Sequence, residues 1–313
     1  MINKCTHEIC PYTLKPLNEL ASINNEHIFP RAIGGKLDYS FKTDEKANSD
    51  LGSRLDAPLV NAPAIASRRM VHNIKSRSGA LEFKLTGNIQ EINKPAVVSF
   101  SSGEDRIVQV NQSVDFNPSG NHGVIIYGNE RQKEKLMKDI GINKKKKNKY
   151  IEWESPEDPG KLTFIGESPN LVRWARSMSK IAYAAVYKYL GDDFLSDPLI
   201  TEWRKLLFAE KDDDAMDADV FFIAFSPADV DAFIPHIQSN QHAAAVFSLG
   251  TDAPIAVAVS LFGKADITYF AIASKSCNYG LDVLEGEIAV CNTSSAGTQF
   301  INFMEHCRAY TGI

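Results

Sequence analysis

Long apolar runs are missing from this sequence, and cysteine is scarce. No stretch approaches the roughly 18 consecutive apolar residues of a membrane-spanning helix, so we expect no membrane span. The N-terminal segment MINKCTHEIC is polar and has no apolar signal-peptide core. The five cysteines are an odd number, which argues against a disulfide framework. Together these absences favour a protein of the reducing cytoplasm.

A basic excess is missing as well. The chain carries 34 Lys and Arg against 39 Asp and Glu, a formal net charge of −5. Because nucleic-acid binders are often basic, this balance counts mildly against such a partner, although it leaves room for a local basic groove. The remaining composition is that of an ordinary globular protein, with 44% hydrophobic residues. A chain of 313 residues is too long for one simple core, which indicates two or three units.

The pattern of elements divides the chain into three regions. Residues 1–78 hold short elements, residues 79–165 hold strand-like runs separated by Gly, Asn and Asp, and residues 166–313 mix helices with strands. We therefore predict an α+β protein with an N-terminal domain, a β-rich middle segment and an α+β C-terminal domain.

Helical spacing is clearest early in the third region. Apolar residues keep a three-and-four rhythm that predicts one long helix, and Gly191 is expected to end it. This apolar stripe consists of Leu171, Trp174, Met178, Ile181, Ala185 and Tyr189. Arg173, Arg176 and Lys180 share the opposite face, the ordinary pattern of an amphipathic helix. The segment SAGTQFINFMEHCRAY, residues 295–310, is predicted to be a terminal helix.

The first region predicts the order strand, turn, strand and helix. EHIFP is a short strand, and IGGKLDYSFKT supplies a glycine turn and the second strand of a hairpin. Asn48, Ser49 or Asp50 would then be the N-cap of a helix, which Pro58 would stop near Ala57.

An acid and a histidine, Glu26 and His27, stand side by side in the first strand. Hydrolysis of a phosphodiester needs an activated water and a cation that stabilises the charge on the phosphate. A histidine can be the general base, and carboxylate or amide oxygens suit Mg²⁺ or Mn²⁺. Because neighbouring strand residues point to opposite faces, both side chains can reach one metal only if the strand bends. Pro30 and Gly34–Gly35 make such a bend plausible.

The stretches EHIFPRAIGGK and ANSDLGSRLDAPL together resemble the HNH (ββα-metal) nucleases. The resemblance is closest to the branch that carries an acid–His–Ile–x–Pro stretch, a double glycine and then Cys-x-x-Cys-Asn. It covers about residues 5–78 and implies a ββα-metal unit there. It also implies His27 as the general base beside the metal, and Asn48 and Glu26 as metal ligands. Asp56 is interpreted as a solvated acid at the helix end rather than a further ligand.

The sequence departs from the family at the cysteines. Members often carry two cysteine pairs that bind a structural zinc, but the second pair falls here on Asp44 and Ala47. A zinc site of Cys5, His7 and Cys10 with a fourth ligand elsewhere is one reading. The other is that the zinc was lost and the thiols are free or buried.

Arginines close to the motif are the candidate contacts to a nucleic acid. Arg31 directly follows EHIFP and is expected to grip the scissile or an adjacent phosphate. Arg54, Arg68 and Arg69 are further candidates, with a solvated helix face as the alternative. No base-reading motif is visible, so we expect a shape- or structure-directed nuclease, or one aimed by a partner, rather than a site-specific reader. DNA is the expected substrate, and RNA is a second candidate.

The hypothesis from the sequence is a cytoplasmic Mg²⁺- or Mn²⁺-dependent endonuclease acting on DNA. The C-terminal region carries no catalytic signature, so it would bind an activating ligand, a protein partner or the DNA itself. The architecture is similar to that of bacterial defence effectors and mobile-element proteins, an analogy of low weight. The alternative is a catalytically decayed HNH protein that acts as a nucleic-acid- or ligand-binding regulatory module.

Overall fold

The chain is a mixed α+β protein, as the sequence predicted, and it divides into two compact units. One unit combines Met1–Gly79 with Pro169–Ile313, and the other is Ala80–Ser168. The first and third predicted regions therefore share one body. The computed structural model describes residues 5–75, 82–89, 94–101, 107–110, 115–116, 124–127, 151–154, 164–166, 170–218, 222–223, 233–234, 237–250, 254–263, 268–275, 279–295 and 297–311.

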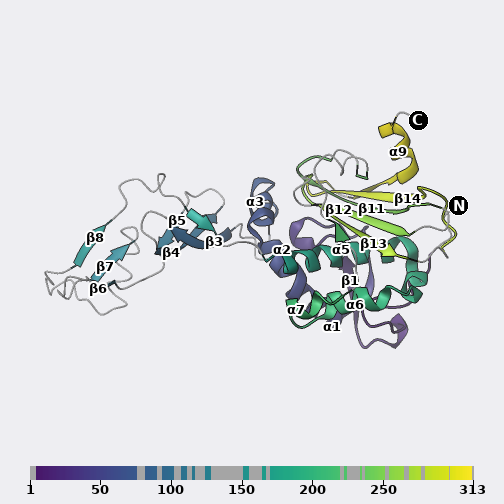
Figure 1. The fold of residues 1–313 in the computed structure, drawn as a ribbon, viewed down its shortest axis with the longest axis horizontal. Coiled ribbons are helices and arrows are strands. Elements are labelled where there is room, and N and C mark those ends of the chain that lie inside the picture. Colours follow the sequence, from purple (N-terminus) through teal and green to yellow (C-terminus); the bar gives the residue numbers. More distant parts are fainter. Residues whose placement is uncertain are drawn as a thin grey trace. The chain divides into compact units, whose positions relative to one another are not determined.

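A six-stranded antiparallel sheet forms the base of the larger unit, with the strand order β10-β13-β12-β11-β14-β15. Figure 1 shows α5 on one face of this sheet and α9 on the other. Alternate residues of the central strands enter two separate cores, with Val246 toward α5 and Phe247 toward α9. The strands are β10 (Phe222–Ile223), β11 (Gln241–Ser248), β12 (Ile255–Ser260), β13 (Thr268–Ser274), β14 (Gly286–Asn292) and β15 (Thr298–Asn302).

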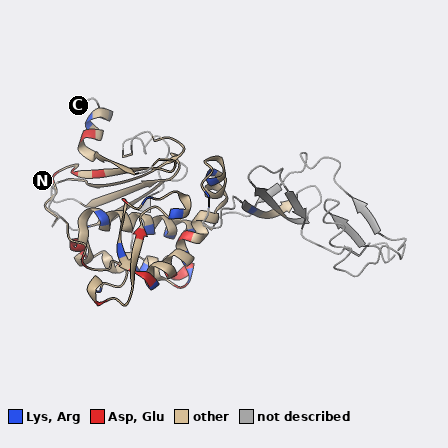
Figure 2. Cartoon of the chain, turned by 180° about the vertical axis from the view of Figure 1, so that it is seen from behind, with Lys and Arg blue, Asp and Glu red and all other residues tan. Residues whose placement is uncertain are grey.

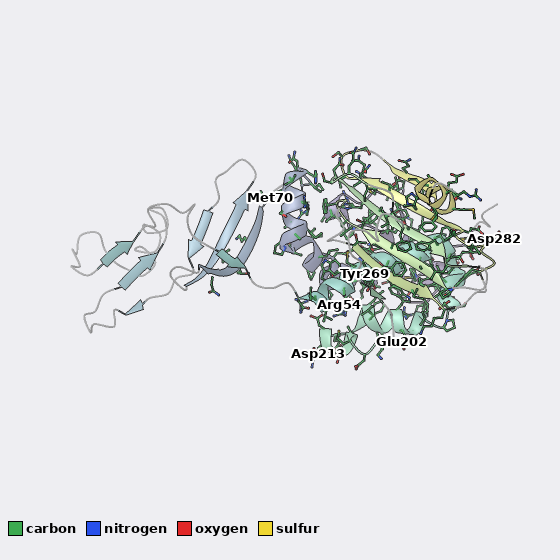
Figure 3. All side chains as sticks on the ribbon, turned by 45° about the horizontal axis from the view of Figure 1, so that its top comes forward. Arg54, Met70, Glu202, Asp213, Tyr269 and Asp282 are labelled. Carbon is green, nitrogen blue, oxygen red and sulfur yellow. The ribbon has the colours of Figure 1, made fainter. Side chains whose placement is uncertain are left out.

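The central helix α5, Leu171–Leu190, confirms the long helix predicted from the apolar stripe. The Asn170 side chain caps it by accepting a bond from the Arg173 N–H at 2.9 Å, and Gly191 ends it with a positive φ of 69°. The hydroxyls of Ser179 and Tyr269 (Figure 3) bond at 2.7 Å and tie this helix to the sheet. The 3-10 turn Gly191–Ser196 and helices α6 (Ile200–Phe208) and α7 (Asp212–Ala215) follow.

The predicted terminal helix begins later than expected. Residues Thr298–Asn302 form the edge strand β15 and pair with β14, and only Phe303–Thr311 is helical, as α9. Pairing with a strand that the local sequence does not reveal outweighs the helical pattern there.

The N-terminal segment supplies a hairpin. Strand β1, Ile23–His27, pairs antiparallel with β2, Ser40–Asp44, in a continuous register. The connection contains a short 3-10 turn, Arg31–Ile33, and then Gly34–Gly35. Gly35 is required by space, because a Cβ there would lie 1.7 Å from the Phe29 carbonyl oxygen.

The helical run after the hairpin starts earlier than predicted. Asp44 is the N-cap and accepts a bond from the Ala47 N–H at 2.7 Å, so Asn48 lies inside helix α1 rather than at its start. Pro58 does not stop the run, because it falls in the first turn of α2, where no backbone N–H is required. The successive elements are α1 (Glu45–Leu51), a π-helical turn η3 (Gly52–Asp56), α2 (Ala57–Asn61) and α3 (Pro63–Val71).

The described residues of the second unit all lie in strands of two small sheets. One sheet has the order β5-β4-β3-β9, and the other has the order β6-β7-β8, in which β7 and β8 are parallel. The strands are β3 (Glu82–Ile89), β4 (Lys94–Ser101), β5 (Ile107–Val110), β6 (Asp115–Phe116), β7 (Val124–Tyr127), β8 (Ile151–Glu154) and β9 (Phe164–Gly166).

Among the described residues, no helix has both the length and the apolar character needed to cross a membrane. Figure 2 shows basic and acidic residues interspersed over the helices of the larger unit. The sign of the charge therefore has to be examined residue by residue at the hairpin.

Candidate functional site

The free edge of β1 is where the predicted site residues meet. Among the residues that the structure describes, the hairpin sheet has two strands, so one edge of β1 faces no other described strand. The Ile28 N–H bonds the Tyr39 carbonyl, and antiparallel pairing then alternates along the strand. The backbone groups of Glu26 therefore point at β2, whereas the carbonyl of Asn25 points outward from the edge.

Asn48 reaches this edge from helix α1. Its amide Nδ2 donates to the Asn24 Oδ1 at 2.8 Å and, more weakly, to the Asn25 carbonyl at 3.4 Å. Since both contacts use the nitrogen, the Oδ1 oxygen is left without a hydrogen bond among the described residues. An amide oxygen held in this way is a suitable donor for Mg²⁺ or Mn²⁺.

His27 approaches the same edge from the other face of the hairpin, and its side chain is half-buried. Burial lowers the pKa of His27, and the charges of Arg31 and Lys180 act in the same direction, whereas an interaction with the Asn25 carbonyl raises it. The net lowering leaves the imidazole neutral at pH 7, the form that a general base needs. His27 and Asn48 thus both lie beside the backbone of Asn25.

Glu26, which the sequence analysis placed at one metal with His27, does not join His27 and Asn48 at this edge. The strand does not bend, because its register with β2 is continuous from Ile23 to His27. Glu26 therefore points to the inner face of the hairpin, where its Oε1 lies 2.8 Å from the Lys180 Nζ of α5. Glu26 is only 4% exposed.

Lys180 holds a second carboxylate at the same place. Its Nζ lies 2.6 Å from the Asp56 Oδ2, so Asp56 is not the solvated acid that the sequence suggested. Burial raises the pKa of Glu26, and Lys180 only partly opposes this. Burial by itself would lower the pKa of Lys180, but Asp56 and Glu26 together raise it. We call Glu26, Asp56 and Lys180 the inner cluster.

The other edge of the hairpin is closed by helix α5. The Lys188 Nζ donates to the Ser40 carbonyl of β2 at 2.9 Å. His27 and Ser40 are register partners outside the hydrogen-bonded pairs, so this carbonyl points away from β1. One edge is thus held by a lysine, and the other carries the candidate site.

The loop between the two strands is clamped by the C-terminal sheet. The His242 Nδ1 accepts a bond from the Phe262 N–H at 3.2 Å, so its Nε2 is the donor to the Ile33 carbonyl at 2.8 Å. Burial lowers the pKa of His242 to about 4, which keeps the ring neutral. A second clamp joins Asp38 to the N–H and hydroxyl of Thr298, at 2.7 and 2.9 Å.

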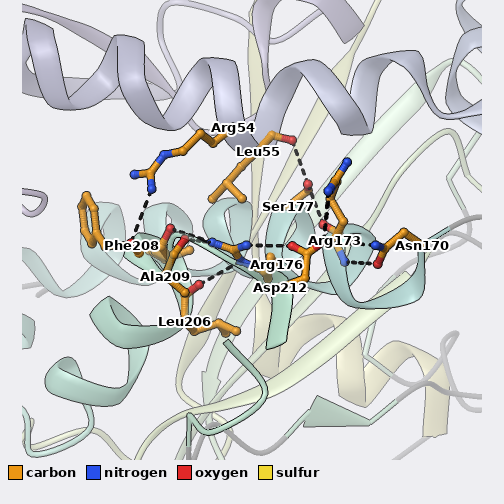
Figure 4. Close-up of polar contacts among 11 residues, drawn as sticks. Arg54, Leu55, Asn170, Arg173, Arg176, Ser177, Leu206, Phe208, Ala209 and Asp212 are labelled. Atoms are coloured by element: carbon orange, nitrogen blue, oxygen red, sulfur yellow. Dashed lines mark hydrogen bonds and ion pairs between the residues drawn. The ribbon is translucent and has the colours of Figure 1, made fainter. Parts of the chain in front are cut away.

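Of the four arginines predicted to contact phosphate, one is exposed and the others are partly or fully buried or bonded to the protein. Arg31 is exposed and lies close enough to His27 to lower its pKa. Arg54 donates to the Phe208 carbonyl at 3.4 Å, as Figure 4 shows, and Arg68 is half-buried. Arg69 is only 7% exposed, which does not suit a surface contact to DNA. Arg31 is therefore the best placed of the four.

The proposed zinc ligands each make contacts of their own. Among the described residues, no group of three or more His, Cys, Asp or Glu side chains is arranged to hold a metal. The Cys10 Sγ lies 3.1 Å from the Thr43 hydroxyl and is fully buried. The Cys5 thiol donates to the Tyr189 carbonyl, and the His7 Nε2 lies 3.2 Å from the carbonyls of Tyr187 and Lys188.

Comparisons with known protein families, with curated proteins and with solved structures found no match to this chain. The side chains of the hairpin and helix α1 are therefore the only basis for a proposed function among the described residues.

Proposed function

We propose that this protein is a metal-dependent endonuclease of the HNH kind that hydrolyses phosphodiester bonds in DNA. One observation supports the proposal more than any other. His27 of β1 and Asn48 of α1, which are 21 positions apart in the sequence, both lie beside Asn25 at the edge of β1 that faces away from β2. A base and an oxygen donor are thereby brought to one place on a rigid frame.

His27 would accept the proton of the attacking water, since its lowered pKa keeps it neutral at pH 7. The Asn25 carbonyl would orient the ring, and Arg31 would hold the phosphate from the end of the strand. Because Glu26 is bound to Lys180, the Oδ1 of Asn48 is the donor best placed for a metal. One or two protein oxygens suffice for Mg²⁺ or Mn²⁺, which keep several waters and bind substrate phosphates. Such an ion stabilises negative charge on the phosphate when bound.

The C-terminal region would control this site. His242 and Thr298 of the C-terminal sheet hold the loop that carries Arg31, so a ligand or protein partner on the sheet has a direct route to the hairpin. A role as a cytoplasmic effector in bacterial defence or in a mobile element fits this arrangement and rests on analogy of architecture alone.

The inner cluster favours one alternative function. Both acidic side chains of the inner cluster are neutralised by Lys180, as in a protein that no longer binds a catalytic metal. On this reading the chain is a decayed nuclease that binds a nucleic acid or a ligand without cutting it.

Nicking of supercoiled plasmid separates the two functions. The full chain is incubated with Mg²⁺, Mn²⁺ or EDTA, beside His27→Ala and the matched control His306→Ala in α9. We expect metal-dependent nicking that falls about 10²- to 10⁴-fold in His27→Ala and persists in the control. Nicking that survives His27→Ala would reject the assigned base. Failure to cut any DNA or RNA with metal bound would favour the alternative.

A further inference from the structure

The outer face of the hairpin carries a cation, Lys42, that neither the motif nor the reaction accounts for. Strand alternation places Asn25 and His27 of β1 on this face, opposite the inner cluster. Their register partners on β2 are Lys42 and Ser40, and cross-strand partners share a face. Lys42 is exposed, stands directly across from Asn25 and is the diagonal neighbour of His27.

The acids of the hairpin do not neutralise this face. Glu26 points inward to Lys180, Asp44 caps helix α1, and Asp38 binds Thr298. Glu45 lies beyond the end of β2, as the first residue of α1. Among the described residues, Lys42 has neither an ion pair nor a side-chain hydrogen bond.

Lys42 and Arg31 lie on opposite sides of His27 along the strand. Lys42 is level with Asn25, before His27, and Arg31 follows His27 at the start of the loop. A polyanion that crosses the outer face would therefore meet a cation, the imidazole and a second cation in succession.

We propose that Lys42 is a phosphate-binding residue and that the DNA backbone crosses the outer face of the hairpin between Lys42 and Arg31. This inference rests on the proposed endonuclease function. The lysine positions the substrate and takes no part in the bond-breaking step. It recognises the phosphate charge and not the base sequence.

The salt dependence of DNA binding tests this role. Binding of a fluorescein-labelled duplex is measured by anisotropy in EDTA, from 50 to about 200 mM salt, a range over which phosphate contacts show clearly. Lys42→Met is compared with Lys46→Met, which makes the same charge change four positions away. Lys46 is a matched control because it already pairs with Asp50 at 3.0 Å and its side chain is 86% exposed.

We expect Lys42→Met to weaken binding and to reduce the slope of log affinity against log salt by about one, with no such change in Lys46→Met. In nicking assays Lys42→Met should raise KM with little change in kcat. Equal slopes for the two variants, or an unchanged KM, would overturn the proposal, as would binding to RNA of the same sequence in preference to DNA. Binding that shows the slope change without any cutting would reject the nuclease function while supporting Lys42.

Discussion

The two faces of the hairpin hold their charges in opposite ways. On the inner face, the buried Glu26 and Lys180 and the partly buried Asp56 neutralise one another at 2.6 and 2.8 Å. On the outer face, His27 and Lys42 are accessible and are not neutralised by a carboxylate of the hairpin. Neighbouring residues of one motif therefore do different work. Glu26 fixes the strand against α5, and His27 is the residue that we propose as the general base.

Removing the central cation should produce the largest loss of stability. Lys180→Met leaves the buried Glu26 carboxylate and the partly buried Asp56 carboxylate without their cation, and we expect the free energy of unfolding to fall by about 3–5 kcal/mol. Denaturant unfolding followed by circular dichroism measures this change. The double variant Glu26→Gln/Lys180→Met should recover part of the loss, because one uncompensated charge is then removed. Equal stability of the single and double variants would contradict the inner cluster as a coupled unit.

Acid should weaken the hold of His242 on the loop that joins the two strands of the hairpin. The pKa of His242 is about 4 in the folded protein against an ordinary 6.5, so the unfolded chain binds the proton more readily. The stabilisation of the folded protein by neutral His242 is complete above pH 6.5. It is lost as the pH falls toward 4, and the free energy of unfolding decreases by about 3 kcal/mol in total. His27 and His72, whose pKa values are also lowered, act in the same direction.

Unfolding free energies at pH 7 and pH 5 measure this loss. His242→Asn should be less stable than the wild type at pH 7 and should lose less stability between the two values. An identical pH dependence in the variant and the wild type would show that His242 is not the group that titrates.

Substitution on the outer face should have the smallest effect on stability. His27→Ala removes a half-buried ring outside the core, so we expect less than about 1 kcal/mol in the free energy of unfolding. The same variant is expected to lose nicking activity. A loss of stability comparable to that of Lys180→Met would erase the distinction between the faces and would make His27 a structural residue.

Local signals in the sequence predicted the local parts of this structure. The apolar stripe from Leu171 and the glycine at 191 located α5, because helix periodicity and a C-terminal glycine act within a few turns. The hairpin followed from short apolar runs around a glycine turn. The sequence predicts Asn48, Ser49 or Asp50 as the cap because they precede an apolar rhythm, but Asp44, at the end of β2, takes that role.

Long-range partners explain what the sequence did not predict. Lys180 shares a helical face with Arg173 and Arg176 and was therefore interpreted as part of an ordinary polar face. It is 2% exposed because β1 and η3 bring carboxylates to it from far earlier in the chain. The outward position of Lys42 could have been found from strand alternation, but only once the register with β1 was known.

The shared core has a consequence for how this chain can be divided. Leu51 and Leu55 lie in the same buried cluster as Tyr183 and Trp203, so residues from both ends of the sequence fill one interior. Residues 80–168 interrupt that body rather than follow it. The segment that resembles HNH nucleases is therefore not an independently folding N-terminal domain. An excised fragment ending near residue 78 would carry the motif without the helix and sheet that give it shape.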